Sequence, residues 1–253
     1  MKILLGGALG RMGREVTAAA AEAQVEIVCG VDVAYTGQPS DYPIVTAFDQ
    51  ATQKADVLID FSRPSALPEL LQLARKEKMP TVLCATGYNE AELQMIEEAS
   101  REIPVFRSAN MSLGVNVLRH LVQEAARALG EDFDVEIVER HHRMKADSPS
   151  GTALMLYDSV KDATETLRQP VFGRYGRTAQ RQPGEVGIHA VRGGTITGEH
   201  EVCFYGDGEE LILTHRAEKR SLFARGALRA AAFLMDKPAG KYDMQDLIEE
   251  MLR

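Results

Sequence analysis

The sequence predicts an α/β protein of two domains: first a doubly wound parallel sheet with helices, then an α+β domain with a largely antiparallel sheet. Up to about residue 112, short apolar runs alternate with stretches at helical spacing, which is typical of strands joined by right-handed helical crossovers. The apolar runs show no clear polar–apolar alternation, as expected when helices cover both faces of a sheet. Beyond residue 112, strand-like runs follow one another across glycine turns, which favours hairpins.

The first half of the chain opens on an apolar run at residues 3–5, which Gly6 and Gly7 end. We interpret this run as a buried strand. Residues 11–23 then place Val16 and several alanines on one face at helical spacing, which predicts a helix. Further strands are expected at residues 25–31, 56–60, 80–84 and 104–106. Further helices are expected at residues 64–78 and 89–101.

The second half begins with a strongly amphipathic segment at residues 115–129, which predicts a long helix. Residues 168–187 are rich in Arg, Gln, Gly and Pro, and a loop of this length in a compact domain is usually functional. Strands are expected at residues 135–141, 188–191, 195–197, 201–205 and 210–214. Helices are expected at residues 153–167, 223–235 and 243–252.

Length and composition exclude several classes of protein. The chain has 253 residues, of which 45% are hydrophobic and 26% charged, as is ordinary for a globular protein. Its net charge of −8 disfavours a general nucleic-acid binder, and no apolar run approaches the ~18 residues of a membrane span. Cys29, Cys84 and Cys203 form no C-x-x-C pair, which indicates reduced thiols in a cytoplasmic protein.

The first turn carries a glycine pattern, Gly7-x-x-Gly10-x-x-Gly13, between the first strand and the first helix. Glycines at this junction allow a tight turn, and the N–H groups of the helix start then face a pyrophosphate. Asp32 ends the second strand 19 residues after Gly13, where an acid receives the hydroxyls of an adenosine ribose. This favours a Rossmann-type dinucleotide-binding domain. The alternative is a tight turn without a ligand, with Asp32 as an ordinary loop residue.

A second cluster lies at residues 139–145, which hold three permanent cations, one acid and two imidazoles in an acidic chain. Residues 150–152 follow and have the composition of a helix N-cap and first turn. A helix start beside Lys145 and His141 is a good receptor for a carboxylate, and both side chains suit proton donation near neutral pH. The alternative is a solvated basic face.

No metal site is expected. His141 and His142 are adjacent, so in an extended chain they point to opposite sides, and His200-Glu201 begins an H-E-x-x-H motif that lacks its final His. The span 168–192 holds five arginines against one acid. These arginines either contact an anionic substrate or a subunit, or belong to a solvated loop.

Taken together, these residues resemble the dihydrodipicolinate reductase family, the 4-hydroxy-tetrahydrodipicolinate reductases of lysine and diaminopimelate synthesis. The resemblance spans nearly the whole chain. Its most specific marks are residues 139–152 (ERHHRMKADSPSGT) and 192–201 (RGGTITGEHE). Further marks are residues 7–13 (GALGRMG), 60–62 (DFS), 85–87 (ATG) and 108–112 (SANMS).

The resemblance implies an enzyme that reduces the cyclic dicarboxylate 4-hydroxy-tetrahydrodipicolinate to tetrahydrodipicolinate with NADH or NADPH. It implies that His141 is the proton donor and Lys145 the catalytic lysine, and that a substrate carboxylate contacts His142, Gly151 and Thr152. The dinucleotide contacts that it implies are Gly7, Ala8, Leu9, Gly10, Arg11, Met12, Asp32, Cys84, Ala85, Thr86, Ser108, Ala109, Asn110 and Met111.

The resemblance also implies a domain organisation and an assembly. Residues 1–112 and 220–253 would form the dinucleotide-binding domain, and residues 113–219 the domain for substrate binding and oligomerisation. Members of the family are usually homotetramers built on the sheet of the second domain. We therefore expect a cytoplasmic homotetramer with a small-molecule substrate and with neither a nucleic-acid nor a membrane partner.

The chain departs from the family pattern at two places. Val33 stands where many members have an Arg that holds a 2′-phosphate, and Cys84-Ala85 stands where many have Gly-Thr. The first departure argues against a strict preference for NADPH. Two other functions are alternatives: a non-catalytic dinucleotide sensor, which would need an output module, and a reductase of an amino acid semialdehyde, which the 139–152 stretch disfavours.

Overall fold

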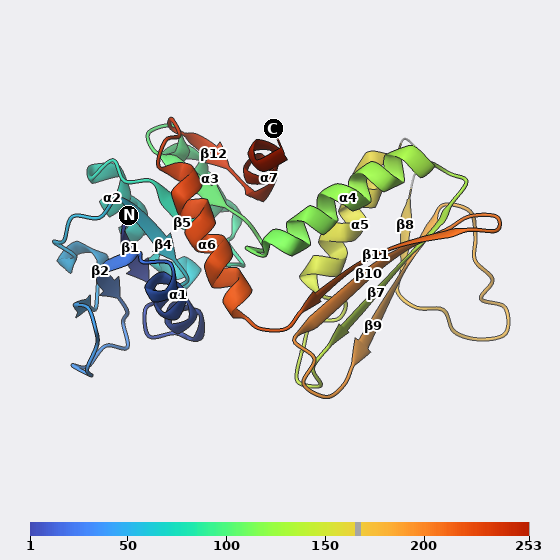
Figure 1. Ribbon diagram of the computed structural model, residues 1–253, viewed down its shortest axis with the longest axis horizontal. Helices are drawn as coiled ribbons and strands as arrows, with labels where there is room; N and C mark the ends of the chain where they lie inside the picture. Colours follow the sequence, from blue (N-terminus) through green and yellow to red (C-terminus); the bar gives the residue numbers. More distant parts are fainter. Residues whose placement is uncertain (165–167, 253) are drawn as a thin grey trace. The chain divides into compact units, whose positions relative to one another are not determined.

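The computed structural model describes residues 1–164 and 168–252 (Figure 1). They divide into two compact units, one formed by Met1–Leu113 with Arg220–Arg253 and the other by Gly114–Lys219. No described helix is both long enough and apolar enough to span a membrane. The end of the helix predicted at residues 153–167 lies outside the described residues, as does residue 253.

The first unit is built on a parallel sheet. Among the described residues, seven strands pair in the order β12-β6-β5-β4-β1-β2-β3, and each pairing is parallel. The strands are β1 (Lys2–Gly6), β2 (Glu26–Val31), β3 (Ile44–Val45), β4 (Val57–Asp60), β5 (Thr81–Leu83), β6 (Pro104–Arg107) and β12 (Gly240–Tyr242). The chain winds from β1 through β2 to β3, then passes to β4 on the other side of β1 and continues outwards. The winding direction therefore reverses between β1 and β4.

Helices cover both faces of this sheet, and alternate residues of the central strands β1 and β4 enter two separate cores. Ile3 and Leu5 of β1 pack into one core with α1 (Arg11–Glu22), α6 (Ser221–Leu234) and α7 (Met244–Leu252). Leu4, which lies between them, packs into the other core with α2 (Leu67–Lys76) and α3 (Glu90–Ser100). This confirms the predicted doubly wound α/β architecture.

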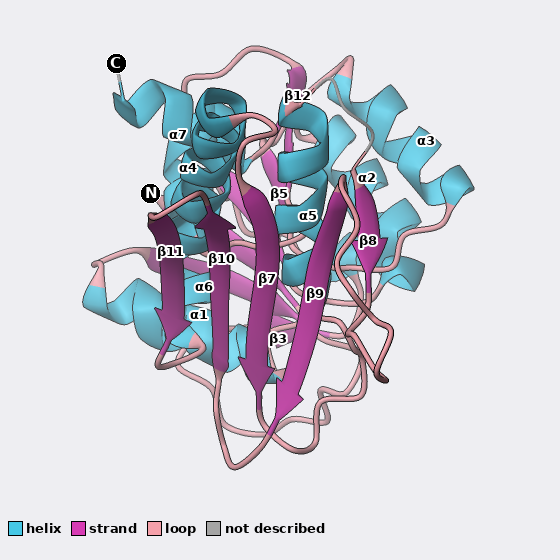
Figure 2. Ribbon diagram, turned by 90° about the vertical axis from the view of Figure 1, so that its right-hand side faces the viewer, coloured by secondary structure: helices cyan, strands magenta, loops and turns pink. Residues whose placement is uncertain are grey.

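The second unit has two layers, a sheet and a pair of helices. Its described strands are β7 (Asp134–His141), β8 (Gln169–Val171), β9 (Glu185–Arg192), β10 (Gly198–Tyr205) and β11 (Glu210–Ala217), in the order β11-β10-β7-β9-β8 (Figure 2). The helices are α4 (Leu113–Leu129) and α5 (Gly151–Ala163). Val135 and Ile137 of β7 share one core with Val122 of α4 and Leu156 of α5. The predicted α+β class of this half is confirmed.

The sheet of the second unit is mixed, whereas the sequence predicted a largely antiparallel one. β10 pairs antiparallel with β7 and β11, but β9 pairs parallel with β7 and β8. The consecutive strands β9 and β10 are joined by a short glycine turn, yet β7 lies between them. Because α5 carries the chain back from β7, β9 runs in the same direction as β7, and a glycine turn in the sequence does not reveal such a crossover.

Several element bounds also differ from the prediction. The strand expected at 195–197 is wrong, since these residues belong to the connection before β10. β8 lies within the expected loop at 168–187, and β3 and β12 were not predicted, because runs of two or three residues carry no periodicity. The helix predicted at 64–78 begins as a 3₁₀ turn, Pro64–Ala66, and a similar turn spans Phe48–Gln50.

Candidate active site

The turn between β1 and α1 shows why glycines stand in the first motif. Gly7 has a φ of +71°, and a Cβ at this residue would lie 2.8 Å from the backbone of Phe61. A Cβ at Gly13 would lie 2.2 Å from the carbonyl oxygen of Gly7, so only glycine lets the helix start this close to the turn. Gly10 is the N-cap of α1, and no side chain of the described residues caps the helix. The N–H groups of this helix start are suited to bind an anion.

Asp32 directly follows β2 and is fixed against the same turn. Its Oδ2 accepts a hydrogen bond from the Leu9 N–H at 2.9 Å, and its Oδ1 accepts one from the Ala34 N–H at 2.9 Å. A carboxylate has about four lone-pair sites, so each oxygen retains acceptor capacity for a ribose hydroxyl. The next side chain, Val33, is 86% exposed and uncharged.

The other two predicted dinucleotide-binding segments follow β5 and β6. The Cys84 N–H donates to the carbonyl of Asp60 at 2.9 Å. Ser108 Oγ donates to the carbonyl of Asn110 at 2.9 Å, and Asn110 Oδ1 accepts from the Ser112 N–H at 2.8 Å. Because the carboxyl ends of parallel strands lie at one edge of a sheet, the structure brings these segments to the edge that holds the glycine turn, where the winding direction reverses.

Asp60, the last residue of β4, has a chemical character that sequence reasoning missed. Its buried carboxyl lies against Gly6, where a Cβ would come within 2.2 Å of Oδ1. Burial raises the pKa of Asp60 to about 6, although hydrogen bonds from Ser62 oppose this shift. Burial, together with Asp60, also raises the pKa of the Cys84 thiol. The sequence signalled only an acid at the end of an apolar strand.

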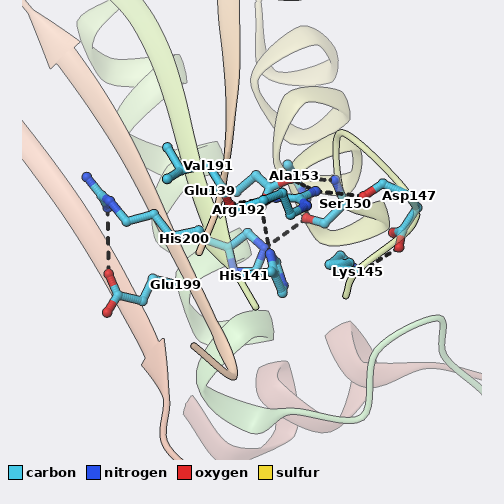
Figure 3. Close-up of polar contacts among 11 residues, drawn as sticks. Glu139, His141, Lys145, Asp147, Ser150, Ala153, Val191, Arg192, Glu199 and His200 are labelled. Atoms are coloured by element: carbon cyan, nitrogen blue, oxygen red, sulfur yellow. Dashed lines mark hydrogen bonds and ion pairs between the residues drawn. The ribbon is translucent and has the colours of Figure 1, made fainter. Parts of the chain in front are cut away.

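In the second unit, the cluster predicted at 139–152 is organised by Glu139, whose side chain is fully buried at 0% exposure (Figure 3). Its Oε2 accepts from His141 Nδ1 at 2.6 Å and from Arg192 Nη1 at 2.7 Å. Its Oε1 accepts from the Ser150 N–H at 2.9 Å and from Arg192 Nη2 at 2.7 Å. Burial favours a higher pKa for Glu139, but these donors outweigh it and lower the pKa. Glu139 is therefore an anion near neutral pH.

His141, the last residue of β7, takes its orientation from this anion. An ionised carboxylate only accepts hydrogen bonds, so Nδ1 of His141 carries a proton and donates a hydrogen bond to Glu139. The opposite nitrogen, Nε2, faces Gly198, where a Cβ would lie 3.0 Å away. Burial lowers the pKa of His141, Glu139 raises it, Lys145 and Arg192 lower it, and the net shift is downward.

His200 of β10 packs edge-on against His141, with the ring centroids 5.2 Å apart. Its Nε2 lies 3.0 Å from the hydroxyl of Ser150, which caps α5 by accepting from the Ala153 N–H at 3.2 Å. Burial, followed by the charge of His141, lowers the pKa of His200 to about 3, so this ring stays neutral. His200 thus supports the first turn of α5.

The remaining predicted residues lie in the loop between β7 and α5 and in the first turn of α5. Lys145 is partly buried, and its Nζ contacts Asp147 Oδ1 at 2.9 Å. The carbonyl of His142 accepts from the Lys145 N–H at 3.1 Å. Gly151 and Thr152 open α5. Because Lys145 acts on the pKa of His141, the two predicted proton-transfer residues share one electrostatic environment.

The predicted group of three cations needs one correction. Arg140 is on the opposite face of β7 from His141, and its Nη1 contacts Glu201 at 3.0 Å, because neighbouring residues of a strand point to opposite sides. Arg192 of β9 joins the cluster instead. Sequence reasoning placed Arg192 among the arginines of the long loop and at the start of the family mark at 192–201, but not beside Glu139, since its register against β7 was not known.

Two of the other loop arginines, Arg174 and Arg181, bind carboxylates within the chain. Arg174 Nη1 donates to Glu136 at 2.9 Å and Nη2 to Glu185 at 3.1 Å, and Arg181 bonds Asp134 and Glu136. His189 Nε2 also contacts Glu136 at 2.6 Å. The described residues contain no group of three or more His, Cys, Asp or Glu that could hold a metal ion.

Comparisons with known proteins cover nearly the whole chain. Residues 1–111 match the model of dihydrodipicolinate reductase, N-terminus, and residues 114–248 that of dihydrodipicolinate reductase, C-terminus. A relative named 4-hydroxy-tetrahydrodipicolinate reductase from Caldanaerobacter subterraneus subsp. tengcongensis is 49% identical over 99% of both chains. One of the same name from Clostridium tetani is 45% identical over 98% of this chain and 97% of the relative.

Solved structures share the fold. A dipicolinate-bound dihydrodipicolinate reductase from Paenisporosarcina sp. TG-14 has a TM-score of 0.78 at 21% identity, and the match covers 96% of this chain and 97% of the other. A probable dehydrogenase from Thermotoga maritima has a TM-score of 0.64 at 13% identity over 100% of this chain and 94% of the other.

Proposed function

Because the chain belongs to the dihydrodipicolinate reductase family, we propose that it reduces 4-hydroxy-tetrahydrodipicolinate to tetrahydrodipicolinate in lysine and diaminopimelate synthesis, with NADH or NADPH as the reductant. The names of relatives at 49% and 45% identity support this activity. Within the chain, one observation carries the proposal. His141 is held through Nδ1 by a buried carboxylate that also holds Ser150, the residue that caps α5.

The first unit fits a dinucleotide. The glycine turn leaves no room for a Cβ at Gly7 or Gly13, and the start of α1 has no side-chain cap among the described residues. We assign the pyrophosphate to residues 7–12 and the ribose hydroxyls to Asp32. The rest of the cofactor would be held by the segments after β5 and β6, which are Cys84, Ala85 and Thr86, and Ser108, Ala109, Asn110 and Met111. When bound, the reduced nicotinamide supplies the hydride.

The second unit is assigned the dicarboxylate. One carboxylate would bind at the first turn of α5, with Gly151 and Thr152, and at the side chain of His142, since helix starts and N–H donors favour anions. Lys145 would neutralise the negative charge that develops on the substrate as the hydride arrives. His141 would supply a proton from Nε2, because Nδ1 is committed to Glu139.

We further propose that the protein is a cytoplasmic homotetramer assembled through the sheet of the second unit. The face of this sheet away from α4 and α5 leaves Val191, Tyr205 and Ile212 between 41% and 44% exposed. Apolar side chains on a sheet face are commonly covered by a partner. Light scattering on the purified protein tests this assembly: four chains per particle are expected, and a monomer would refute it.

One experiment separates the proposed activity from its rivals. The purified protein is incubated with NADH and enzymatically generated 4-hydroxy-tetrahydrodipicolinate, and the absorbance of NADH is followed. Oxidation that depends on both reactants is expected. Binding of NADH without turnover would indicate a dinucleotide sensor, and turnover only with an amino acid semialdehyde would indicate the related reductase.

A further inference from the structure

Glu139 binds more groups than His141 alone. Each of its two carboxylate oxygens accepts two hydrogen bonds, and only one of these four bonds comes from His141. We propose that Glu139 is a positioning residue of the reaction: it fixes the tautomer of His141 and lets that imidazole take up the proton that it delivers. The inference rests on the proposed function, in which His141 is the proton donor.

The division of donors between the two oxygens supports this role. Oε2 bonds His141 Nδ1 at 2.6 Å and Arg192 Nη1 at 2.7 Å. Oε1 bonds the Ser150 N–H at 2.9 Å and Arg192 Nη2 at 2.7 Å. One oxygen therefore orients the proton donor, while the other holds the start of the helix that is assigned to the substrate carboxylate. Arg192 bridges both oxygens and fixes the plane of the carboxylate.

The charges around His141 show why the imidazole depends on Glu139. His141 faces Glu139 on its own strand, Arg192 on β9, His200 on β10 and Lys145 in the following loop. Of these, Lys145 and Arg192 oppose a positive charge on His141, and Glu139 favours it. A protonated imidazole has N–H groups at both nitrogens. The carboxylate accepts from Nδ1 in the neutral and in the protonated ring, so His141 can gain and lose its Nε2 proton without turning.

The substitution Glu139→Gln separates the two functions of this side chain. If the amide oxygen replaces Oε1, it still accepts from Ser150 and from Arg192 Nη2. The amide NH₂ then replaces Oε2 and donates to His141 Nδ1, while the bond from Arg192 Nη1, also a donor, is lost. In the reverse orientation the NH₂ would face the Ser150 N–H, which is also a donor, so the orientation with the amide oxygen toward Ser150 is favoured. His141 is thereby forced into the opposite tautomer and loses the anion that favours its protonated form.

We therefore expect Glu139→Gln to lower kcat by ~10²-fold or more, as is usual when a proton-transfer group is lost or misoriented. The alkaline limb of the kcat/KM profile, where His141 loses its proton, should move to lower pH by about one unit or more. Inhibition by pyridine-2,6-dicarboxylate should change less than threefold, because the bonds to Ser150 remain. A Gln variant with the wild-type kcat and pH profile would overturn the proposal.

Glu136→Gln is the matched control, because Glu136 lies on the same strand and, like Glu139, bonds arginine and one histidine, but on the opposite face; its partners are two arginines, Arg174 and Arg181, and His189. It should keep the wild-type pH profile. If the alkaline limb of the control shifts by as much as that of Glu139→Gln, the shift comes from the loss of any negative charge on the strand, and the proposal is overturned. Light scattering on both variants shows whether the assembly is intact.

The tautomer of His141 can also be measured in the wild-type protein, so the proposal is testable even if Glu139→Gln does not fold. The nitrogen chemical shifts of neutral His141, assigned by comparison with His141→Gln, should show the proton on Nδ1. A proton on Nε2 would overturn the proposal. If the wild-type protein binds NADH but does not oxidise it with the dicarboxylate, the proposed function fails instead, whatever the tautomer of His141.

Discussion

Replacing Arg192 by Met should destabilise the second unit, because it leaves a buried carboxylate without its permanent counter-charge. Arg192 donates both Nη groups to Glu139 at 2.7 Å, its side chain is 19% exposed, and that of Glu139 is 0% exposed. Removing one partner of a buried ion pair typically costs ~3–5 kcal/mol. His141 and Ser150 still bond Glu139, so we expect a loss near the lower limit, about 3 kcal/mol. Methionine keeps the apolar stem of the side chain, which confines the effect to the guanidinium; besides Glu139, this group donates to the carbonyls of Val191 and Asp147.

Chemical denaturation at pH 7, followed by circular dichroism, measures this loss. A protein of this size should also melt about 6–12 °C lower. Arg127→Met is the control, because Arg127 pairs with Glu124 on the surface of α4, with about half of each side chain exposed, and such pairs contribute ~0.3–0.5 kcal/mol. A loss below 1 kcal/mol for Arg192→Met, or one equal to that of the control, would refute the reasoning.

The same pair gives a pH dependence with a defined sign. The pKa of Glu139 is lower in the folded protein than its ordinary value, so the unfolded chain binds the proton more readily. The stability that the pair contributes is complete above the ordinary pKa of Glu, roughly 4.3, and is lost as pH falls through the folded value. Stability measured between pH 7 and pH 3 should therefore fall less steeply in Arg192→Met. An identical slope in both proteins would show that Glu139 is not held ionised by Arg192.

Three further outcomes are expected. NADH should be used at least as well as NADPH, because Asp32 repels a 2′-phosphate and Val33 offers no cation; a preference for NADPH of about a hundredfold, ~2.8 kcal/mol in kcat/KM, would contradict this. Pyridine-2,6-dicarboxylate should inhibit competitively, and Thr152→Val should weaken the inhibition by about 1 kcal/mol or somewhat more; unchanged inhibition would place the carboxylate elsewhere. Lys145→Ala and His141→Ala should each lower kcat by ~10²–10⁴-fold with little change in cofactor affinity, and their effects should combine to less than the product. Near-full kcat in either variant would remove that residue from the assigned chemistry.

The architecture of the first unit could be predicted from the sequence because it depends on local patterns. Ile3, Leu4 and Leu5 are all apolar, and the structure divides them between two cores, which is what a sheet covered on both faces requires. The short strands β3 and β12 were missed, because two or three residues cannot show a period. The mixed sheet of the second unit was missed for a different reason: strand order depends on long-range pairing, and a Gly-Gly turn does not specify it.

In the candidate site, too, the features that depend on local spacing could be predicted, and those that depend on long-range pairing could not. The glycine turn and Asp32 are close in sequence to the elements that place them, so spacing predicts their meeting at one edge of the sheet. The pairing of Glu139 with Arg192 joins residues 53 positions apart and depends on the register of β7 against β9. No pattern within either strand encodes that register, so the centre of the cluster could be recognised only in the structure.

The division of the first unit into two chain segments has a consequence for biosynthesis. Translation delivers β1 to β6 and α1 before the second unit, but the helices α6 and α7, which share one core with them, are made after it. Until the C-terminal segment leaves the ribosome, Ile3, Val57 and Phe106 lack the alanine-rich helix that buries them. The intervening unit has a complete core of its own and can reach its native state sooner. The segment that is synthesised first can therefore complete its core only after the C-terminal segment has been made.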